Sequence, residues 1–342
     1  MEPHATAEHL PFLLDRAIAA RTPFFDERHQ AAFRLFNGFA EGCPTLVIDL
    51  YAATAVLYNH AKPPELGLPQ VAVAQALLQQ RFPWIHTIIL KTRHTTSMPE
   101  QQGVLLAGDA PDRSVREHGI RYAVDLTMNR DASLYLDTRN LRRWAMEHLG
   151  GKTALNTFAY TGSLGVAAMA GGAARVVQLD LNRRFLNVAK TSYTLNGFPI
   201  NKADFQTGDF WPAINRMKWG GERFDCVFVD PPIFAATAGG VVDLARNYTK
   251  VINKVRPLIN DGGTLVAINN ALFLSGRDYM AMLEAICADG YVRIGELIPV
   301  PDDCTGGPDA SSAGQITDPA PFNHSTKIAV LHIRRKSDSQ NS

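Results

Sequence analysis

The feature that most constrains the fold is a regular alternation of apolar strand-like runs and helical runs through the C-terminal two thirds of the chain. Strand-like runs at 154–158 and 175–180 are separated by a helical stretch rich in small residues, 162–170. Strands that alternate with helices of about 10–15 residues predict parallel pairing with right-handed crossovers. The pattern continues with strands at 204–207, 225–230, 264–269, 291–298 and 325–334 and helices at 182–195, 241–259 and 277–288. We therefore expect an α/β fold with a doubly wound, mostly parallel, seven-stranded sheet of Rossmann-like type, closed by an antiparallel pair.

The N-terminal part of the chain has a different pattern. Short β-like runs at 45–49, 55–58 and 87–91 surround one helical stretch at 70–81, which predicts a compact α+β module. Residues 119–137 are typical of a β-hairpin, with turn residues at Asn129-Arg130-Asp131. The predicted division is an α+β module at 1–118, with a possible role in substrate recognition, a hairpin and connecting helix at 119–150, a Rossmann-like domain at 151–336 and a disordered tail at 337–342.

Composition limits the function classes without selecting one. The chain has 342 residues, 46% hydrophobic and 20% charged, and a net charge of +1, which does not by itself indicate a nucleic-acid partner. Its four cysteines are scattered, with no CxxC pair, so we predict no metal site. The N-terminus lacks the pattern of a secretory signal, and no apolar run approaches the ~20 residues that span a bilayer. We expect a cytoplasmic protein with no membrane partner.

The loop after the first strand, Asn156-Thr-Phe-Ala-Tyr-Thr-Gly162, is a candidate cofactor loop. Gly162 lets the backbone turn close to a ligand, and the following helix presents unpaired N–H groups there. Two glycines of the dinucleotide pattern GxGxxG are missing, so a pyrophosphate would be poorly held, whereas a zwitterionic methionine group needs less. A tight strand-to-helix turn without a ligand is the alternative interpretation.

Acidic residues end the next two strands. Asp180 follows Gly162 by eighteen residues, the approximate spacing at which a carboxylate binds the hydroxyl pair of a ribose. Asp209 ends the third strand, where it can accept from an adenine amino group while Phe210 covers the ring. Either carboxylate alone is as well explained as a loop cap, but their positions at successive strand ends reinforce each other.

The fourth strand ends in Asp230-Pro231-Pro232-Ile233-Phe234. Two prolines remove N–H donors and stiffen the backbone, so the carbonyls at this point are held rigidly. Such carbonyls can accept hydrogen bonds from an amino group, and Phe234 can stack on a planar base. A simple strand terminator is the alternative.

Several segments together carry a resemblance to a known family. They are NTFAYTGSLGVAA, VVQLD, DFQTGDFW, VFVDPPIF and LYLDTR. The chain resembles the bacterial ribosomal RNA large-subunit methyltransferases, class I S-adenosylmethionine-dependent enzymes that include 5-methylcytosine and 7-methylguanosine types. The resemblance runs from about residue 24 to 335, because AFRLFNGFAEGCPTLVIDLY and HGIRYAVDLTMNRDASLYLDTRNLR also resemble that family's upstream segments.

This resemblance implies the cofactor, the partner and a set of site residues. The implied cofactor is S-adenosylmethionine, the implied partner is ribosomal RNA, and a homodimer is possible. The segment 135–139 is implied to fold over the cofactor, although Asp137 alone would be interpreted as a helix N-cap. The implied cofactor-binding residues are Asp137, Arg139, Asn156, Phe158, Tyr160, Thr161, Gly162, Asp180, Leu181, Asp209 and Phe210, and the implied catalytic residues are Asp230, Pro231, Pro232 and Phe234.

The chain departs from the family in its N-terminal region. Many relatives begin with an RNA-binding domain of the PUA type, and only about twenty residues precede the matching region here, so we expect that domain to be absent. RNA would then be captured by the α+β module and by exposed basic residues, although such residues on helices are commonly just solvated. The candidates are Arg139, Arg142, Arg143, Arg183 and Arg184.

The second departure concerns the chemistry. Methylation of cytosine C5 needs a cysteine thiolate, and the end of the fifth strand, where such relatives place it, reads Asn269-Asn270-Ala271. Cys226 lies inside a strand and is expected to be buried, which leaves Cys304 as the only candidate for an exposed thiol. The sequence therefore favours direct transfer to a nitrogen. In the loop before the last strand, His324 can orient a base or shuttle a proton, or it can simply belong to a polar loop cluster.

Three other functions stay open at this point. A small-molecule methyltransferase is favoured by the near-neutral charge and the expected lack of the N-terminal domain. An NAD-dependent oxidoreductase is disfavoured by the missing glycines, by Asp230-Pro231-Pro232 and by the predicted closing antiparallel pair. A catalytically silent RNA-binding scaffold would retain the fold without the reaction.

Overall fold

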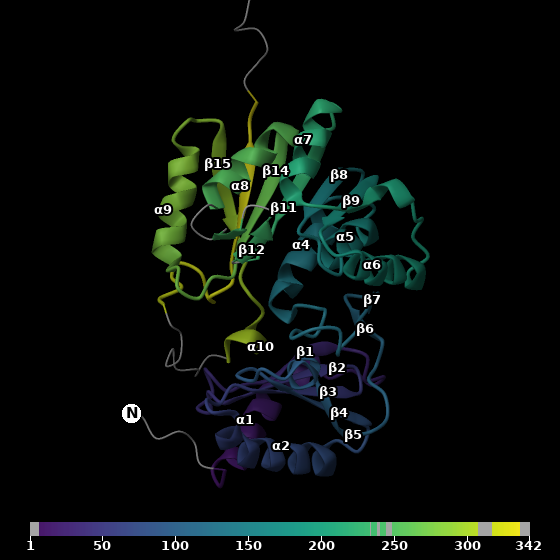
Figure 1. Ribbon diagram of the computed structural model, residues 1–342, viewed down its shortest axis with the longest axis vertical. Helices are drawn as coiled ribbons and strands as arrows, with labels where there is room; N and C mark the ends of the chain where they lie inside the picture. Colours follow the sequence, from purple (N-terminus) through teal and green to yellow (C-terminus); the bar gives the residue numbers. More distant parts are fainter. Residues whose placement is uncertain (1–6, 233, 238–239, 244–247, 307–316, 336–342) are drawn as a thin grey trace, which may run out of the picture. The chain divides into compact units, whose positions relative to one another are not determined.

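The computed structural model describes residues 7–232, 234–237, 240–243, 248–306 and 317–335 (Figure 1). The chain forms two compact units. The first consists of Met1–Arg139 and Pro301–Gln315, and the second of Asn140–Val300 and Ile316–Ser342. Each unit has its own hydrophobic core. No sequence signal indicated that a segment beginning at Pro301 belongs with the N-terminal part of the chain.

The first unit is a five-stranded sheet covered on one face by two helices. The strands, in spatial order, are β1 (Ala32–Asn37), β2 (Leu46–Tyr51), β3 (Thr54–Asn59), β4 (Thr87–Thr92) and β5 (Val104–Ala107). β3 and β4 pair in parallel and the other neighbours are antiparallel. The helices are α1 (Leu10–Ala20) and α2 (Leu68–Arg81), and α2 is the crossover between the two parallel strands. A shorter helix, α3 (Met98–Gln102), precedes β5.

Alternation along β1, β2 and β3 decides which side chains meet the helices. Leu35, Ile48 and Leu57 pack into the core that α1 and α2 cover. Because successive residues of a strand point to opposite faces, the neighbours Arg34 and Asp49 lie on the other face, directly across from each other. The two faces of this sheet therefore differ, one apolar and covered by helices, the other carrying charged side chains.

The prediction of a β-hairpin at 119–137 is wrong. The hairpin of this region is formed by β6 (Ser114–Glu117) and β7 (Ile120–Ala123). His118 and Gly119 have φ of +49° and +83°, the two positive values that a tight type I′ turn requires. Residues 124–135 form no strand, because the turn-like Asn129–Asp131 segment is held instead as a loop, with the Lys91 ammonium donating to Asn129 O and Asp131 O.

The second unit is a seven-stranded sheet with six parallel strands and one antiparallel strand. In spatial order these are β10 (Phe205–Thr207), β9 (Arg175–Asp180), β8 (Thr153–Thr157), β11 (Phe224–Val229), β14 (Ile259–Asn269), β16 (Lys327–Ile333) and β15 (Val292–Leu297). β16 runs antiparallel to both of its neighbours. The strand order reverses between β8 and β11. This arrangement confirms the predicted doubly wound, Rossmann-like sheet with its antiparallel closure.

Helices cover both faces of this sheet (Figure 1). α4 (Arg139–His148) and α5 (Ser163–Ala170) pack with Ala154 and Phe228 in one core cluster, and α6 (Arg183–Leu195) lies beside α5. α7 (Phe210–Trp219), α8 (Tyr248–Val255) and α9 (Gly276–Cys287) pack with Leu155 and Val227 on the opposite face. Adjacent residues of one strand thus enter different cores, which is why the strands read as continuous apolar runs.

The helix predicted at 241–259 is also wrong in its extent. The first part of that range forms β13 (Gly240–Asp243), which pairs with β12 (Phe234–Thr237), and among the described residues of the range the α-helix is Tyr248–Val255. Pro257 lies in a 3-10 turn (Arg256–Leu258) that ends the helix, because proline lacks an N–H and disfavours helical geometry before it. The buried stripe Tyr248, Val251 and Val255 is confirmed, while Leu244 lies outside the described residues.

Two negative findings apply to the residues that the structure describes. None of their helices has both the length and the apolar character needed to cross a membrane. Within the same residues, no three His, Cys, Asp or Glu side chains come together as ligands for a metal ion.

Candidate active site

Most of the predicted site residues lie where neighbouring parallel strands end. β10, β9, β8 and β11 are adjacent in this order, so their carboxyl ends meet at one edge of the sheet, around the reversal between β8 and β11. Open α/β sheets bind their ligands at this kind of edge. The residues located there are Asn156, the loop Phe158–Gly162, Asp180, Leu181, Asp209, Phe210, Asp230, Pro231 and Pro232.

The loop after β8 holds an unusual backbone conformation. Phe158, Tyr160 and Gly162 all have positive φ, at +53°, +51° and +74°, and the first two are not glycines. Such conformations cost free energy, persist only where the surroundings enforce them, and cluster at ligand sites. Here the backbone N–H of Ala159 donates to Leu179 O at 2.9 Å, and that of Tyr160 donates to the Asp180 carboxylate at 2.7 Å. The sequence did not reveal this strain.

Gly162 is required by close packing as well as by its φ. A Cβ at this position would lie 2.5 Å from the Ala189 Cβ of α6. Its carbonyl oxygen accepts from the Gln178 amide at 3.2 Å, and the oxygen of that amide accepts from the Asn156 side chain at 2.8 Å. Asn156 and Gln178 are both buried, so their amide pair ties the end of β8 to the glycine loop. Gln178 was missed from the sequence, although a glutamine inside the apolar run VVQLD is the signal that could have found it.

Asp180 is fixed by two backbone donors. Its carboxylate accepts from the N–H groups of Tyr160 and Asn182, each at 2.7 Å. Burial raises the pKa of this carboxyl, and the two backbone hydrogen bonds hold it down in part. An ionised carboxylate has about four acceptor sites, so two remain for a diol such as that of a ribose. Leu181, the next residue, exposes 65% of its surface and offers an apolar face beside the carboxylate.

Asp209 and the rings around it form the wall after β10. The Asp209 carboxylate caps α7 by accepting from Trp211 N at 2.9 Å. The Phe210 ring stacks on Phe158, with centroids 4.7 Å apart, and is 7% exposed. Of this aromatic pair, Phe158 is the more exposed ring. On the other side of the loop, Tyr160 meets Phe185 of α6 edge to face, with centroids 4.6 Å apart, and Thr161 is buried.

The Asp230-Pro231-Pro232 segment is supported from below by two buried tyrosines. The Tyr248 hydroxyl lies 3.2 Å from Val229 O and 2.8 Å from Ile268 O, so it bridges the carboxyl ends of β11 and β14. The Tyr279 hydroxyl donates to it at 3.3 Å. Burial raises the pKa of both phenols well above the ordinary value, so both stay protonated. Phe234 is the first residue of β12, and its side chain, like Ile233, lies outside the described residues.

A buried lysine at the end of β14 was also missed from the sequence. Lys327 begins β16 directly across from Asn269. Its ammonium donates to Ala271 O and Ser325 O, and burial lowers its pKa to about 8. In the sequence, a buried lysine at the start of a strand has no pattern that distinguishes it from a solvated lysine.

Comparison with known proteins then decides the family. Residues 67–303 match the model of the S-adenosylmethionine-dependent methyltransferases. The chain belongs to this family. It is 29% identical over 268 residues to a ribosomal RNA large subunit methyltransferase I from Erwinia tasmaniensis, covering 76% of this chain and 65% of that protein. It is 30% identical over 289 residues to the protein of the same name from Vibrio cholerae, covering 82% and 71%. The chain thus spans about two thirds of the length of these relatives.

A solved structure with the same fold extends the likeness to almost the whole chain. SMU.776, a proposed methyltransferase crystallised with SAH, superimposes with a TM-score of 0.82 at 20% identity, covering 97% of this chain and 83% of that one. Membership of the methyltransferase family decides against the NAD-dependent oxidoreductase and assigns S-adenosylmethionine as the cofactor.

The residues at the sheet edge fit the cofactor of this methyltransferase family. The carboxylate of Asp180 retains acceptor capacity for a ribose, and Leu181 and Phe158 offer apolar surface for a planar base. The helix after Gly162 is α5 (Ser163–Ala170), whose first-turn N–H groups lie at the end of the loop. These features suit a nucleoside joined to an amino acid, without a pyrophosphate.

Two of the four cysteines of the methyltransferase lie in the first unit and two in the second. The expectation that Cys304 could be an exposed thiol is wrong, because Cys304 is fully buried in the first unit and burial raises its pKa. Cys226 is buried within β11, as predicted. Cys287 ends α9, which leads into the start of β15, at the edge of the sheet opposite the carboxyl ends. Cys43 lies in the core of the first unit.

Asp137 and Arg139 belong to the first unit, whereas the other predicted cofactor residues belong to the second. Asp137 lies in a single 3-10 turn (Leu136–Thr138), and the α-helix begins at Arg139. The Arg139 guanidinium pairs with both oxygens of Asp303, at 2.9 and 2.7 Å. The prediction of Arg139 and Arg142 as exposed basic residues is wrong, since both are buried. Arg143, Arg183 and Arg184 are exposed, as predicted.

His324 is half-buried in the loop before β16. Its Nδ1 accepts from Thr326 N at 3.0 Å. The neighbouring Asn323 side chain bonds both backbone groups of Val300, at 2.9 and 2.8 Å. This segment therefore has the character of a polar loop cluster.

Proposed function

We propose that this methyltransferase transfers a methyl group from S-adenosylmethionine to a base of ribosomal RNA by direct displacement, without a cysteine nucleophile. The observation that carries the proposal is the Asp230-Pro231-Pro232 segment, which follows β11 at the same sheet edge as the cofactor loop. The names of the relatives support ribosomal RNA as the substrate. The proposal takes its substrate class, ribosomal RNA, from the family that includes the 5-methylcytosine and 7-methylguanosine enzymes. It does not assign this chain to either type.

The residues proposed to hold the cofactor divide by chemistry. Asp180 accepts from the ribose hydroxyls, and Asp209 accepts from the adenine amino group. Leu181 and the stacked pair Phe158 and Phe210 border the ring, while Tyr160, Thr161 and Gly162 shape the loop around the methionine part. Asn156 acts through Gln178 to hold that loop. Asp137 and Arg139, taken from the resemblance, are retained as proposed cofactor residues.

In the proposed reaction, the main role of the protein is to position the reactants, and acid–base catalysis contributes less. S-adenosylmethionine supplies an electrophilic methyl group, so the acceptor nitrogen must be held in line with it. The Asp230 carboxylate and the backbone carbonyls before the prolines would accept from the amino group of the base. Tyr248 fixes the strand ends beneath them, at Val229 O and Ile268 O. Phe234 is proposed to stack on the base.

The lack of a suitable thiol supports transfer to a nitrogen. A nucleophilic cysteine needs a lowered pKa and access to its substrate. Burial raises the pKa of all four thiols of this chain, and in the second unit neither Cys226 nor Cys287 lies at the carboxyl edge of the sheet. A cytosine C5 mechanism has no visible nucleophile at this edge.

Purified protein would be tested by transfer of labelled methyl groups from S-adenosylmethionine into total RNA from a strain lacking the enzyme, with protein and small-metabolite extracts in parallel. We expect label in large-subunit ribosomal RNA, and nucleoside digestion would identify the acceptor atom. Label found only among the metabolites would show that the substrate is a small molecule. The net charge of +1 favours this alternative. Binding of RNA without any transfer would indicate a silent scaffold.

A further inference from the structure

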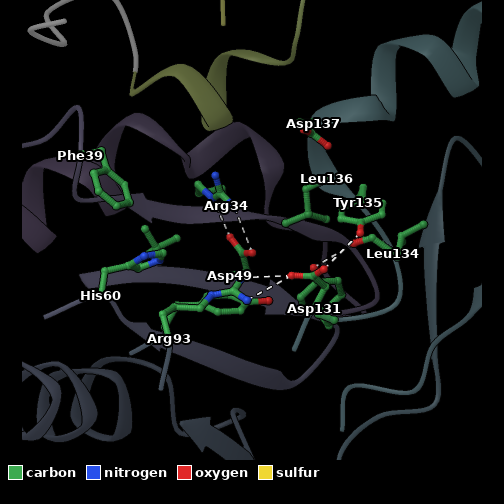
Figure 2. Close-up of a pocket in the computed structure, with 14 residues that line it drawn as sticks. Arg34, Phe39, Asp49, His60, Arg93, Asp131, Leu134, Tyr135, Leu136 and Asp137 are labelled. Carbon is green, nitrogen blue, oxygen red and sulfur yellow. Dashed lines mark hydrogen bonds and ion pairs between the residues drawn. The ribbon is translucent and has the colours of Figure 1, made fainter. Parts of the chain in front are cut away.

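A cavity of about 220 Å³ lies on the face of the first unit's five-stranded sheet that α1 and α2 do not cover (Figure 2). Its floor is formed by side chains of β1, β2 and β3, including Arg34, Asp49 and Tyr58, which point away from α1 and α2. The segment from Asp131 to Asp137 forms one wall, and Phe39 and His60 form another. One residue of the cavity wall, Asp137, is also a proposed cofactor residue. The other lining residues have no part in the proposed cofactor site.

Two pairs of opposite charge lie within the cavity. Arg34 pairs with Asp49 across β1 and β2, with N–O distances of 2.8 and 3.3 Å. Arg93 donates to one oxygen of Asp131 from both of its terminal nitrogens, at 3.1 Å each, as the dashed lines of Figure 2 show. With Asp137, the lining has three carboxylates for two guanidinium groups. A phosphate or another anion is therefore a poor ligand for this cavity.

The remaining surface suits a neutral planar ligand. Phe39 and His60 meet edge to face with centroids 4.9 Å apart, and Arg93 lies over the Tyr58 ring at 4.8 Å. Burial, together with the positive charges of Arg93 and Arg34, lowers the pKa of His60 to about 3. The imidazole is thus neutral at pH 7, with one nitrogen to donate and one to accept a hydrogen bond. Flat faces beside such a group are the means by which proteins bind unstacked bases.

The wall of the cavity is held in place by several tertiary hydrogen bonds. The Lys91 ammonium donates to Asn129 O at 2.7 Å, and Arg93 donates to Arg130 O at 3.0 Å. The Tyr51 hydroxyl donates to Leu134 O at 3.0 Å, and the Tyr135 hydroxyl donates to the Asp131 carboxylate at 3.1 Å. The cavity is therefore formed before a ligand arrives, and binding would order little additional chain.

We propose that this cavity binds one unpaired nucleobase of the substrate RNA, so that the first unit contributes directly to recognition. The proposal rests on the proposed function as an RNA methyltransferase. The volume is below the roughly 300–1,000 Å³ of pockets for drug-sized ligands, and it suits a single heterocycle. The sugar and phosphate would stay outside this lining, which has one carboxylate more than it has guanidinium groups.

The test measures binding of the four nucleoside monophosphates and of ribose 5-phosphate to the full chain, by ligand-observed NMR at two salt concentrations. We expect at least one nucleoside monophosphate to bind, with an affinity that changes little with salt, and ribose 5-phosphate to bind at least tenfold more weakly. Equal binding of ribose 5-phosphate, a steep salt dependence, or no binding of any nucleotide at 10 mM, roughly the weak end for stacking on a single ring, would overturn the proposal.

Two variants test whether the nucleotide binds in this cavity. Phe39→Ala removes a ring and should weaken nucleotide binding about fivefold or more, in line with base stacking on one aromatic side chain. His60→Phe keeps an aromatic ring and removes the hydrogen-bonding nitrogens, so it should also weaken binding. Phe12→Ala, an exposed phenylalanine of α1 that does not line the cavity, is the matched control and should change nothing. If Phe39→Ala does not fold, His60→Phe carries the test, and unchanged binding in a folded variant would contradict the proposal.

Methyl transfer to large-subunit ribosomal RNA, measured on the same samples, separates this proposal from the proposed function. Nucleotide binding with no transfer to RNA would reject the RNA methyltransferase and show that the cavity takes free nucleotides. Transfer to RNA that is equal in wild type, Phe39→Ala and His60→Phe would reject the cavity as an RNA site and leave the function standing. A raised KM for RNA in both variants, with kcat nearly unchanged, is the result that we expect.

Discussion

At the scale of single residues, the cofactor loop depends on backbone conformations that few residues adopt. Three of its five residues, Phe158, Tyr160 and Gly162, have positive φ, and Asp180 holds the middle one through its backbone N–H. The sequence pointed to Gly162 and Asp180 separately, as a turn and as a strand-end carboxylate. The structure shows that they act on the same loop, because the carboxylate of one strand end fixes the backbone after the other.

Gly162→Ala should weaken binding of S-adenosylhomocysteine by at least tenfold and lower the free energy of unfolding by about 2–4 kcal/mol, from its left-handed φ and the clash with Ala189. Gly172→Ala is the matched control, since Gly172 also has positive φ but has no atom within 4 Å of the position that a Cβ would take. It should cost about 1–2 kcal/mol and leave affinity unchanged. Calorimetric titration and urea unfolding measure both quantities. Equal affinity losses in the two variants would show that Gly162 matters only for its φ.

Asp230→Ala should abolish methyl transfer and leave the affinity for S-adenosylhomocysteine within a few fold of wild type. The reason is that Asp230 follows β11, on the proposed acceptor side, whereas the proposed ribose and adenine contacts come from β9 and β10. Transfer of labelled methyl groups and calorimetry report the two properties separately. If both fell together, Asp230 would belong to the cofactor site instead.

At the scale of elements, local sequence pattern and tertiary contacts disagree in two places. Residues 241–259 have a helical apolar stripe, yet among the described residues of this range the α-helix is Tyr248–Val255, because Pro257 ends it and residues 240–243 pair with β12. The Asn129–Asp131 segment has turn composition, yet its carbonyls are taken up by Lys91 and no strand follows. Pro257 lies within the predicted helix, whereas β12 and Lys91 lie outside the segments whose predicted structure they change.

The junction of β14 and β16 carries a titratable group whose effect on stability can be measured. The pKa of Lys327 is lowered by burial to about 8, from an ordinary value of 10.5. Between these two pH values the unfolded chain still binds a proton that the folded chain has released, so folding becomes more favourable as pH rises. We expect wild type to gain stability relative to Lys327→Met between pH 8 and 10.5, as measured by urea unfolding.

The comparison with Lys327→Met cancels the titration of other groups, including the thiols and phenols, which act in the opposite direction at high pH. A difference between the two proteins that stays constant across this range would mean that Lys327 keeps its ordinary pKa in the folded state.

At the scale of the whole molecule, the chain has separate cores in its two units, and the proposed cofactor residues lie mainly in the second. Leu35, Ile48 and Leu57 belong to the core of the first unit, whereas Leu155 and Val227 belong to the second. A ligand stabilises the part of a protein that forms its site, by an amount that grows with ligand concentration over Kd. The two units can therefore respond differently to the same cofactor.

S-adenosylhomocysteine at about 100 times its Kd should add ~2.7 kcal/mol to the stability of the second unit. Hydrogen exchange should slow in β8, β9 and α6, and should be unchanged in α1, α2 and β2. Mass spectrometry of exchanged peptides measures both, and Gly162→Ala at the same ligand concentration is the control that should lose the protection. Equal protection of α1 and α2 would show that the two units unfold as one.

The sequence by itself determined the α/β class, the seven strands of the second unit and the carboxylates at successive strand ends. It could do so because these features depend on local apolar runs, and because parallel strands necessarily bring their carboxyl ends to one edge. The resemblance added the cofactor, and the family match confirmed it. Gly162, Asp180, Asp209 and Asp230 were all recognisable from their positions after strands.

Only the tertiary structure decided what those residues touch. Several features depend on residues that are distant in sequence. They are the strained loop at Phe158 and Tyr160, the Asn156–Gln178 amide pair, the burial of Cys304 and Lys327, and the pairing of Arg139 with Asp303. Burial and hydrogen bonding depend on neighbours brought together by folding, and no single segment records them. The cavity of the first unit arises in the same way, from alternate residues of three strands and a loop that lies much further along the chain.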